Sequence, residues 1–307
     1  MTDWLALLSP NRVVAWRRLS VAAGTPGRPV AYSSAAVSFD GIATGDRLWV
    51  ITLLQASYGR VPSLVARITV DRVLRPDDRL VDERDRGLLQ IYGHSWTRGT
   101  RCPVVAVADE HSFLAPFFDV STWLRCLRLV PRRRKHEPFA RLLVPEEGDP
   151  NWSRFGWQLR GPRRILAPEP ADWVRRRLVP AGPGGGREGV FLSYRWHEAQ
   201  RSAVQLARAL TRRGTPVWLD SLVLYRTRPR TPDLVLRALI GVGLDRCRAV
   251  VALVGPDYRT DARRAGSWVG WELSEAANRQ RPVIEVSIDS HAWLDTALRE
   301  LQAYAIT

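Results

Sequence analysis

Residues 189–194 read GVFLSY, a run of mostly apolar, β-forming residues that is typical of a strand buried on both faces of a sheet. Between Glu198 and Arg213 the apolar residues recur at helical spacing, and Gly214 stands where a helix C-cap is expected. Short β-rich runs and helical segments continue to alternate along the rest of the chain. This alternation predicts an α/β domain over residues 189–307, with a parallel sheet flanked by helices on both faces.

The remaining elements of this domain follow from the same patterns. Strands are expected at residues 216–220, 248–254 and 282–288, and helices at 233–241 and from Ser267 to Asn278. Residues 301–307, LQAYAIT, are interpreted as a fifth strand, which would leave no room for a final helix. Without that helix, apolar sheet surface would be exposed unless the N-terminal domain or another protomer covers it.

Distinctive residues gather where the expected strands end, at the edge of a parallel sheet where functional groups meet. They are SYR at 193–195, VWLD ending at Asp220, GPDY at 255–258, SWVGWEL at 267–273 and IDSHAW at 288–293. In this order and at this spacing, the set resembles the TIR domain family over residues 189–307. The resemblance implies a flavodoxin-like fold that cleaves NAD⁺ between nicotinamide and ribose, using a glutamate on the helix after the third strand.

The residue chemistry agrees with that implication. Trp268 and Glu272 are four residues apart on one expected helix, so an indole and a carboxylate share a face. The cationic nicotinamide ring is attracted to an indole by roughly 0.5–2 kcal/mol. As the glycosidic bond breaks, positive charge develops on the ribose, and a carboxylate such as that of Glu272 stabilises it. Glu272 is therefore the predicted catalytic residue.

The resemblance also implies substrate-binding roles at other positions. Arg195 would pair with the dinucleotide phosphates, and the backbone around Tyr194 lies where phosphate or nicotinamide would pass. Asp220 would orient a ribose hydroxyl or the following loop, and Trp293 would stack on a substrate ring, including one in a neighbouring protomer. NAD⁺ enters as the substrate, so no cofactor is expected, and no metal site is expected either.

Simpler interpretations of the same residues stay open. Trp268 could belong to the core, and Glu272 could be an ordinary solvated helix residue, because TIR domains that act only as scaffolds retain a similar glutamate. A non-catalytic adaptor is therefore the alternative function. The loop at residues 221–233, SLVLYRTRPRTPD, also departs from the family, since it lacks the usual glycine and is rich in Arg and Pro.

The N-terminal domain is expected to cover residues 1–180, with a Gly/Pro linker at 181–188, because PAGPGGGREG at 180–189 has no apolar periodicity. Strands are predicted at 45–55 and 62–74, and helices at 121–130, capped by Ser121, and at 170–178, which makes this part β-rich α+β. The two strands resemble the small β-barrels of the PUA and EVE type. We expect a sensor domain whose partner is nucleic acid, a nucleotide signal or a protein.

Eight of the 13 tryptophans lie in the N-terminal domain. They allow two interpretations, core packing and a base-stacking cage. The tryptophans are Trp4, Trp16, Trp49, Trp96, Trp123, Trp152, Trp157 and Trp173.

Net charge points in two directions. A chain of 307 residues is long enough for two domains, and its formal charge of +15 is typical of proteins that bind nucleic acid or anionic membranes. Lys135 is, however, the only lysine, so codon usage in a GC-rich bacterial genome explains the arginine excess equally well. A third function is therefore a nucleic-acid-binding sensor that uses the basic N-terminal domain.

Other features place the protein in a reducing cytoplasm. The first twelve residues lack the pattern of a secretory signal, and no run of 18 apolar residues predicts a membrane span. Cys102, Cys126 and Cys247 have neither disulfide-framework nor zinc-ligand spacing. Together the sequence predicts a cytoplasmic bacterial effector of anti-phage defence that cleaves NAD⁺ when it self-associates through its TIR domain.

Overall fold

The structure of the chain is a computed structural model that divides into two compact units. The N-terminal unit comprises Met1–Leu53, Pro62–Ala115 and Val120–Val174, and the C-terminal unit comprises Leu54–Val61, Pro116–Asp119 and Arg175–Thr307. The described residues are 1–25, 28–56, 59–75, 82–83, 85–88, 104–110, 112–114, 120–130, 140–142, 144–145, 155, 158–159, 161–166, 189–219 and 233–304. The expected linker at 181–188 and the expected helix at 170–178 lie outside them, so the predicted domain boundary stays a prediction.

A parallel four-stranded sheet forms the centre of the C-terminal unit, as the sequence predicts. Its strands are β10 (Val190–Tyr194), β11 (Val217–Trp218), β12 (Ala249–Val254) and β13 (Val283–Ser287), in the order β11-β10-β12-β13. Each neighbouring pair is parallel, and β10 aligns Val190 with Ala249 of β12. All residues of β10 and β12 are buried, which explains why these strands appear in the sequence as unbroken apolar runs.

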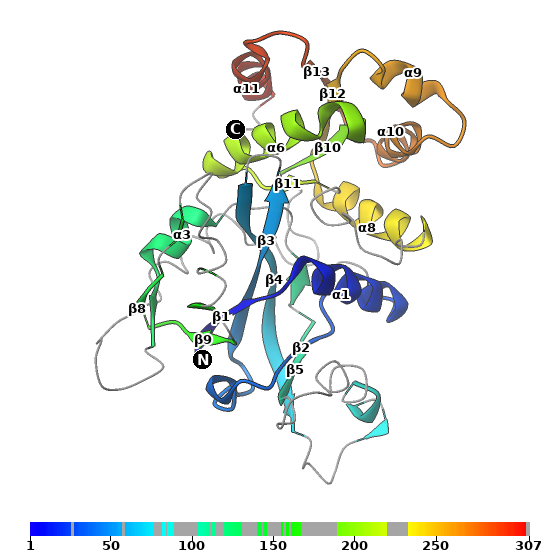
Figure 1. Cartoon of the computed structure of the whole chain (residues 1–307). Coiled ribbons are helices and arrows are strands. Elements are labelled where there is room, and N and C mark those ends of the chain that lie inside the picture. Colours follow the sequence, from blue (N-terminus) through cyan, green and yellow to red (C-terminus); the bar gives the residue numbers. More distant parts are fainter. Residues whose placement is uncertain are drawn as a thin grey trace. The chain divides into compact units, whose positions relative to one another are not determined.

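Helices cover both faces of this sheet (Figure 1). They are α6 (Trp196–Arg212), α8 (Asp233–Arg246), α9 (Tyr258–Arg263), α10 (Trp268–Asn278) and α11 (Trp293–Ala303). Apolar residues of α6 and α11 pack against the sheet face that carries Leu192 and Val251. Residues of α8 and α10 pack against the opposite face, which carries Phe191 and Val250. Because strand side chains alternate between faces, neighbouring residues of one strand serve different helix layers.

The interpretation of residues 301–307 as a fifth strand is wrong. Helix α11 runs through Ala303 and Tyr304 follows in a turn, while residues 305–307 lie outside the described part. Ala297, Leu298 and Leu301 of α11 are buried against the sheet, and the intervening residues face solvent. This helical spacing of apolar residues, which begins before the LQAYAIT segment, decides the element type. Helix α11 is therefore the final helix that covers the sheet, which the sequence had been expected to lack.

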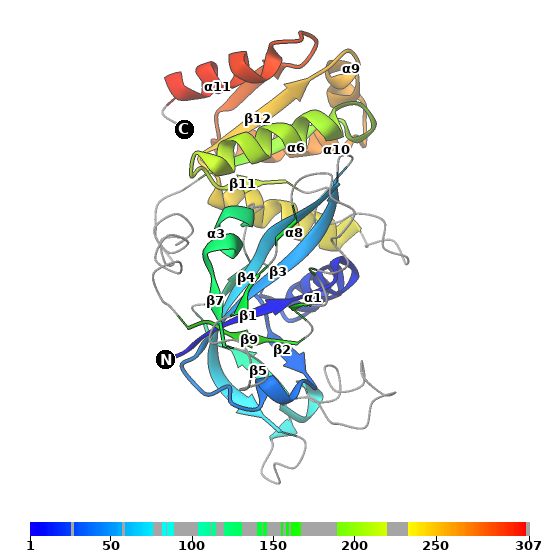
Figure 2. The same cartoon turned by 60° about the vertical axis from the view of Figure 1, so that its left-hand side comes forward.

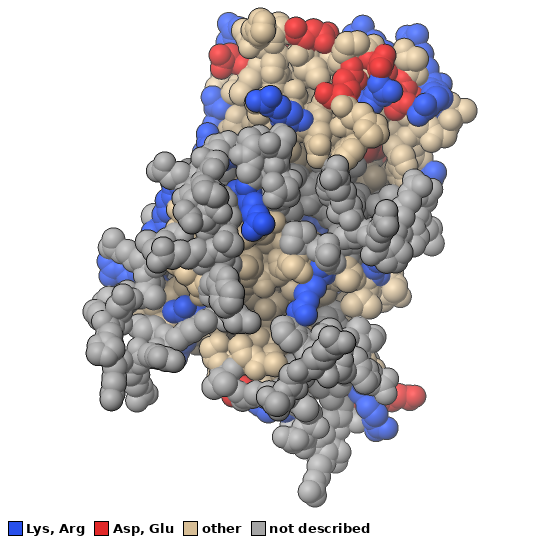
Figure 3. Space-filling model, in the orientation of Figure 1, with Lys and Arg blue, Asp and Glu red and all other residues tan. Residues whose placement is uncertain are grey.

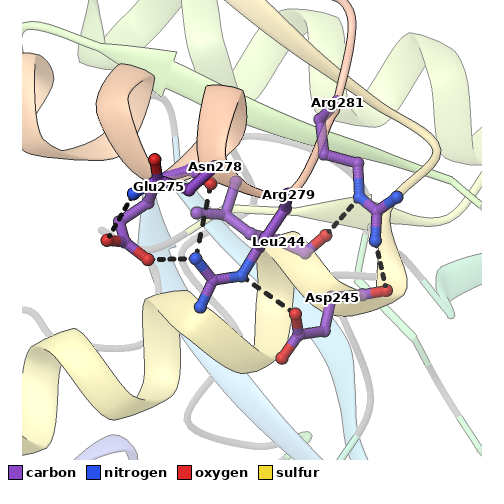
Figure 4. Close-up of polar contacts among 6 residues, drawn as sticks. All are labelled: Leu244, Asp245, Glu275, Asn278, Arg279 and Arg281. Atoms are coloured by element: carbon purple, nitrogen blue, oxygen red, sulfur yellow. Dashed lines mark hydrogen bonds and ion pairs between the residues drawn. The ribbon is translucent and has the colours of Figure 1, made fainter.

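Two arginines fasten the end of α10 to the end of α8 (Figure 4). Arg281 donates from Nε to the Leu244 carbonyl at 3.0 Å and from Nη2 to the Asp245 carbonyl at 3.2 Å, so it satisfies backbone acceptors at the C-terminus of α8. Arg279 pairs with Glu275 of α10 and donates to Asp245 Oδ1 at 2.9 Å. The helix layer on this face is thereby tied together at its edge.

The N-terminal unit is built on a mixed β-sheet, which confirms the β-rich expectation. The sheet order is β2-β5-β4-β3-β1-β9, with β6 also paired to β4, and β1 runs parallel to β3. The long strands β3 and β4 lie side by side in Figure 2. The elements are β1 (Asp3–Leu7), α1 (Pro10–Ala22), β2 (Ala31–Ser34), η1 (Val37–Phe39), β3 (Arg47–Ala56), β4 (Gly59–Leu74), β5 (Val104–Ala108), β6 (Phe113–Leu114), α3 (Ser121–Cys126), β7 (Arg128–Leu129), β8 (Ala140–Arg141) and β9 (Arg163–Arg164).

The helix expected at 121–130 is shorter than predicted. It ends at Cys126 because Leu127 adopts extended backbone angles, and Arg128–Leu129 then form a strand. Ser121 is the first helical residue rather than the cap, a position that Val120 occupies without a side-chain hydrogen bond.

The tryptophans of the N-terminal unit that the structure describes belong to its core. Trp4, Trp16, Trp49 and Trp123 are all buried. Trp4 donates to Asp46 at 3.0 Å and Trp49 donates to Asp3 at 3.1 Å, so two buried carboxylates hold indole N–H groups. This confirms the core interpretation for these four. The other four tryptophans of the predicted N-terminal domain lie outside the described residues.

Described basic side chains are dispersed over the face of the protein drawn in Figure 3. On the face drawn in Figure 3, the described arginines lie over both units and form no single patch among the described residues. No helix within the described ranges is both long and apolar enough to cross a membrane. On this face, the described arginines therefore mark no single helix or strand as a binding surface for an anionic partner.

Contact between α8 and β11 provides a stability test. A Cβ on Gly243 would press into the Trp218 indole, which is buried, whereas a Cβ on Gly241 would meet only the end of the Arg279 side chain at 3.4 Å. We expect Gly243→Ala to lower the free energy of unfolding by about 1–3 kcal/mol through overpacking. Gly241→Ala on the same helix should leave it unchanged or raise it by up to about 1 kcal/mol. Urea unfolding of both variants measures the difference, and equal stabilities would contradict the packing argument.

Candidate functional site

Helix α10 begins at a side-chain cap. Ser267 Oγ accepts a hydrogen bond from the Gly270 N–H at 3.2 Å, as the sequence predicts, and donates to Asp261 Oδ2 at 3.1 Å. Gly270 leaves no room for a side chain, because a Cβ there would collide with the Ala262 carbonyl of α9. These contacts fix the start of α10 against the preceding helix, and with it the position of the residues one turn along.

Glu272 is a buried carboxylate held by a hydroxyl of the central strand. Its side chain is on the inner face of α10, and the residue is only 4% exposed. Ser193 of β10, which is fully buried, donates from Oγ to Glu272 Oε2 at 2.7 Å. The Tyr258 hydroxyl lies 3.0 Å from Ser193 Oγ. Three elements, β10, α9 and α10, therefore meet at the Ser193 hydroxyl near the carboxyl end of the sheet.

Tyr258 is also buried, at 2% exposure. Burial raises the pKa of its hydroxyl well above the ordinary value, and the negative charges of Glu272 and Glu285 raise it further. The hydroxyl therefore stays protonated throughout the physiological pH range.

The loop between β12 and α9 is clamped to the start of α6. Glu198 accepts a hydrogen bond from the Asp257 N–H at 3.0 Å, and its carboxylate lies over Gly255 where a Cβ would stand. Arg195, the residue before α6, forms an ion pair with Asp257. The clamp holds the segment that leads directly into Tyr258.

Trp268, the first residue of α10, packs on the sheet face that α8 covers. Its ring packs edge-to-face against Trp271, with centroids 5.7 Å apart, and both rings contact the core layer formed with α8. The guanidinium of Arg237, an exposed residue of α8, stands over both rings, 5.6 Å from the Trp268 centroid and 5.0 Å from that of Trp271. A cation thus already occupies an aromatic face beside the helix that carries Glu272.

Comparison with known proteins agrees with this architecture. Residues 190–307 match the family model of the TIR domain. The C-terminal region is a TIR domain. No curated protein matches the chain. The match begins at the first residue of β10 and includes every strand and helix of the parallel sheet, so it covers all the residues around Glu272.

The predicted site residues of the TIR domain that the structure describes lie on both faces of the sheet. Tyr194 is buried in the core layer below α6, and Arg195 lies next to it with its charge balanced by Asp257. Trp293, at the start of α11, packs against that same layer, on the opposite sheet face from Trp268. Asp220 lies outside the described residues, so its role stays a prediction. Among the described residues, no group of three or more His, Cys, Asp or Glu is arranged to hold a metal ion.

Ser193 and Tyr258 were not among the predicted site residues, although they belong to the SYR and GPDY motifs. Strand alternation already places Ser193 on the same sheet face as Phe191, the face that α10 covers. Tyr258 is the last residue of the GPDY turn. This turn directly follows the third strand, so it lies at the carboxyl edge of the sheet. Glu198 gave no signal, because an acidic residue in the first turn of a helix is ordinary.

The Ser267 cap predicts a measurable effect on the helix that carries Glu272. Ser267→Ala removes the acceptor for the Gly270 N–H and should lower the free energy of unfolding by about 1 kcal/mol. The exposed Ser274 of the same helix is the matched control, and Ser274→Ala should change stability by less than about 0.5 kcal/mol. Thermal unfolding of the two variants checks the difference, and an unaffected Ser267→Ala protein would rule out the cap as a stabilising contact.

Proposed function

We propose that this TIR domain cleaves NAD⁺ at the bond between nicotinamide and ribose, with Glu272 as the catalytic carboxylate. The observation that carries the proposal is the burial of Glu272 at the carboxyl end of a parallel sheet, where open α/β folds bind their ligands. A carboxylate withdrawn from water is unusual unless it is paired or has a function. In the proposed biological role, the chain is a bacterial defence effector that becomes active on self-association.

The proposed reaction uses the negative charge of Glu272. Nicotinamide leaves as a neutral base with the electron pair of the glycosidic bond, and the ribose carbon becomes positively charged in the transition state. A fixed carboxylate in a poorly hydrated site stabilises that charge more strongly than water does. Attack by water and loss of one proton then yields ADP-ribose, and attack by a nitrogen of the adenine base yields a cyclic product. Glu272 needs no proton of its own for this role.

Trp268, one helical turn before Glu272 on α10, supports the proposal on one condition. Nicotinamide in NAD⁺ is a flat cation, and Trp268 already attracts a flat cation, the guanidinium of Arg237. Stacking of nicotinamide on that aromatic face requires Arg237 to move away. In this proposal Arg237 is a competitor of the substrate, and Arg195 must likewise exchange Asp257 for the dinucleotide phosphates.

The alternative is an adaptor that assembles with other TIR domains and performs no chemistry. The same assay separates the two functions, provided it is run at high protein concentration, because self-association is part of the proposal. The absence of NAD⁺ loss at every protein concentration would favour the adaptor.

Replacement of the carboxylate tests the catalytic role. Glu272→Gln keeps the size of the side chain but removes its charge, so nicotinamide release from NAD⁺ should fall by about 10²–10³-fold. Glu275 lies on the same helix in an ion pair with Arg279, away from Ser193, so Glu275→Gln should retain activity. Chromatographic measurement of nicotinamide gives both rates. Undiminished cleavage by the Glu272→Gln protein would remove the mechanism.

Competition by Arg237 predicts a gain of binding. Arg237→Ala should lower the KM for NAD⁺ by about two- to tenfold, since a cation–π contact of roughly 0.5–1.4 kcal/mol no longer has to be broken. Arg201, an exposed arginine of α6, is the control for loss of one positive charge, and Arg201→Ala should leave the KM unchanged. Steady-state kinetics measure both, and a raised KM in the Arg237→Ala protein would show that this arginine assists binding.

A further inference from the structure

We propose that Tyr258 and Ser193 are positioning residues that act in series on Glu272, so that the tyrosine holds the carboxylate ionised and oriented through the serine hydroxyl. The inference rests on the proposed function for its catalytic consequence. The hydrogen-bond relay itself, from α9 through β10 to α10, does not depend on the proposed function.

The direction of the relay follows from counting protons. A serine hydroxyl has one proton to donate and accepts with its lone pairs. Ser193 gives that proton to Glu272 Oε2 at 2.7 Å, so the contact with Tyr258 at 3.0 Å needs the proton of the tyrosine. Tyr258 therefore donates to Ser193, and Ser193 donates to the carboxylate. Both hydrogen bonds favour a negatively charged Glu272 over a protonated one.

Burial makes each step of the relay effective. Ser193, Tyr258 and Glu272 are 0%, 2% and 4% exposed, so little bulk water competes for their hydrogen bonds. In a poorly hydrated environment such bonds are electrostatically stronger, and a chain of donors polarises the next bond along. Burial makes an ionised carboxylate unfavourable. The same burial strengthens the two hydrogen bonds that stabilise the ionised form of Glu272.

Placement of the tyrosine is set by the clamp on the preceding loop. The carboxylate of Glu198 fills the space over Gly255 and binds the Asp257 N–H, one residue before Tyr258. Tyr258 itself packs with Val254 and Val269, which link the end of β12 to α10. Its ring is therefore held from both sides, and its hydroxyl has a fixed direction toward Ser193.

The charged groups near Tyr258 keep its hydroxyl protonated. The negative charge of Glu285 on β13 acts on Tyr258. Glu285 itself forms an ion pair with Arg259 of α9 at 2.8 Å. On the loop side, Glu198, Arg195 and Asp257 are engaged with one another or with the backbone. The negative charges of Glu285 and Glu272 both oppose ionisation of Tyr258, which keeps it a donor.

The decisive experiment follows the titration of Glu272 directly. The side-chain carboxyl ¹³C resonance of Glu272, assigned by its loss in Glu272→Gln, is followed as a function of pH. The measurement is made on the unsubstituted full-length protein, on Tyr258→Phe, on Ser193→Ala and on the double variant. We expect the pKa of Glu272 to rise by about half a unit to one unit in each single variant. Tyr258→Phe should add no shift when Ser193→Ala is already present, because the relay passes through the serine. Tyr304, which is 60% exposed, supplies the control Tyr304→Phe, with no shift.

Activity provides the second measurement. In Tyr258→Phe, kcat should fall about tenfold at low pH with little change in KM, and the acidic limb of the kcat profile should move upward with the pKa of Glu272. Circular dichroism confirms that the variant folds. An unchanged Glu272 titration in a folded Tyr258→Phe protein overturns the relay, as does an additional shift in the double variant. Absence of NAD⁺ cleavage in every protein, with the titration shifts intact, overturns the proposed function alone.

Discussion

The hydrogen bond from Ser193 to Glu272 joins the two parts of the TIR domain on which its candidate site depends. Ser193 belongs to β10, which pairs with strands on both sides, and Glu272 belongs to a helix that is capped at its start and fastened to α8 at its end. A shift of either element would lengthen this hydrogen bond to a buried carboxyl group, and loss of a buried hydrogen bond is costly. Through Ser193 the carboxyl group is also linked to Tyr258, so strand β10 and helices α9 and α10 are connected at one point.

Close packing holds that geometry in place. Gly243 lets α8 approach the Trp218 indole, Gly270 lets α10 approach α9, and Gly255 makes room for the Glu198 carboxylate. A methyl group at these positions would collide with the Trp218 ring, the Ala262 carbonyl and the Glu198 side chain, respectively. The cation–π contact of Arg237 differs in kind, because it lies on an exposed side chain and is worth only roughly 0.5–2 kcal/mol. This contact is therefore exchanged more easily than the close packing at the three glycines.

Agreement between sequence and structure is closest where one residue pattern allows only one element. The buried runs of β10 and β12, and the helix that starts after Ser267, lie where the sequence predicts them. The pattern failed at residues 301–307, because a short apolar segment taken alone fits a strand as well as the end of a helix. It also failed at the end of α3, where the chain turns extended at Leu127 to form β7. In both cases the wider context, rather than local preference, decides the element.

The sequence by itself determined the α/β class of the C-terminal region, its TIR resemblance and the choice of Glu272 and Trp268, because periodicity and motif spacing are local properties of the chain. Only the tertiary structure decided what those side chains meet. It placed Ser193 and Tyr258 on Glu272, Arg237 on Trp268, and Trp293 on the opposite face of the sheet. These contacts join residues as many as 79 positions apart, and which of them form depends on the crossing of strands and helices that no local pattern encodes.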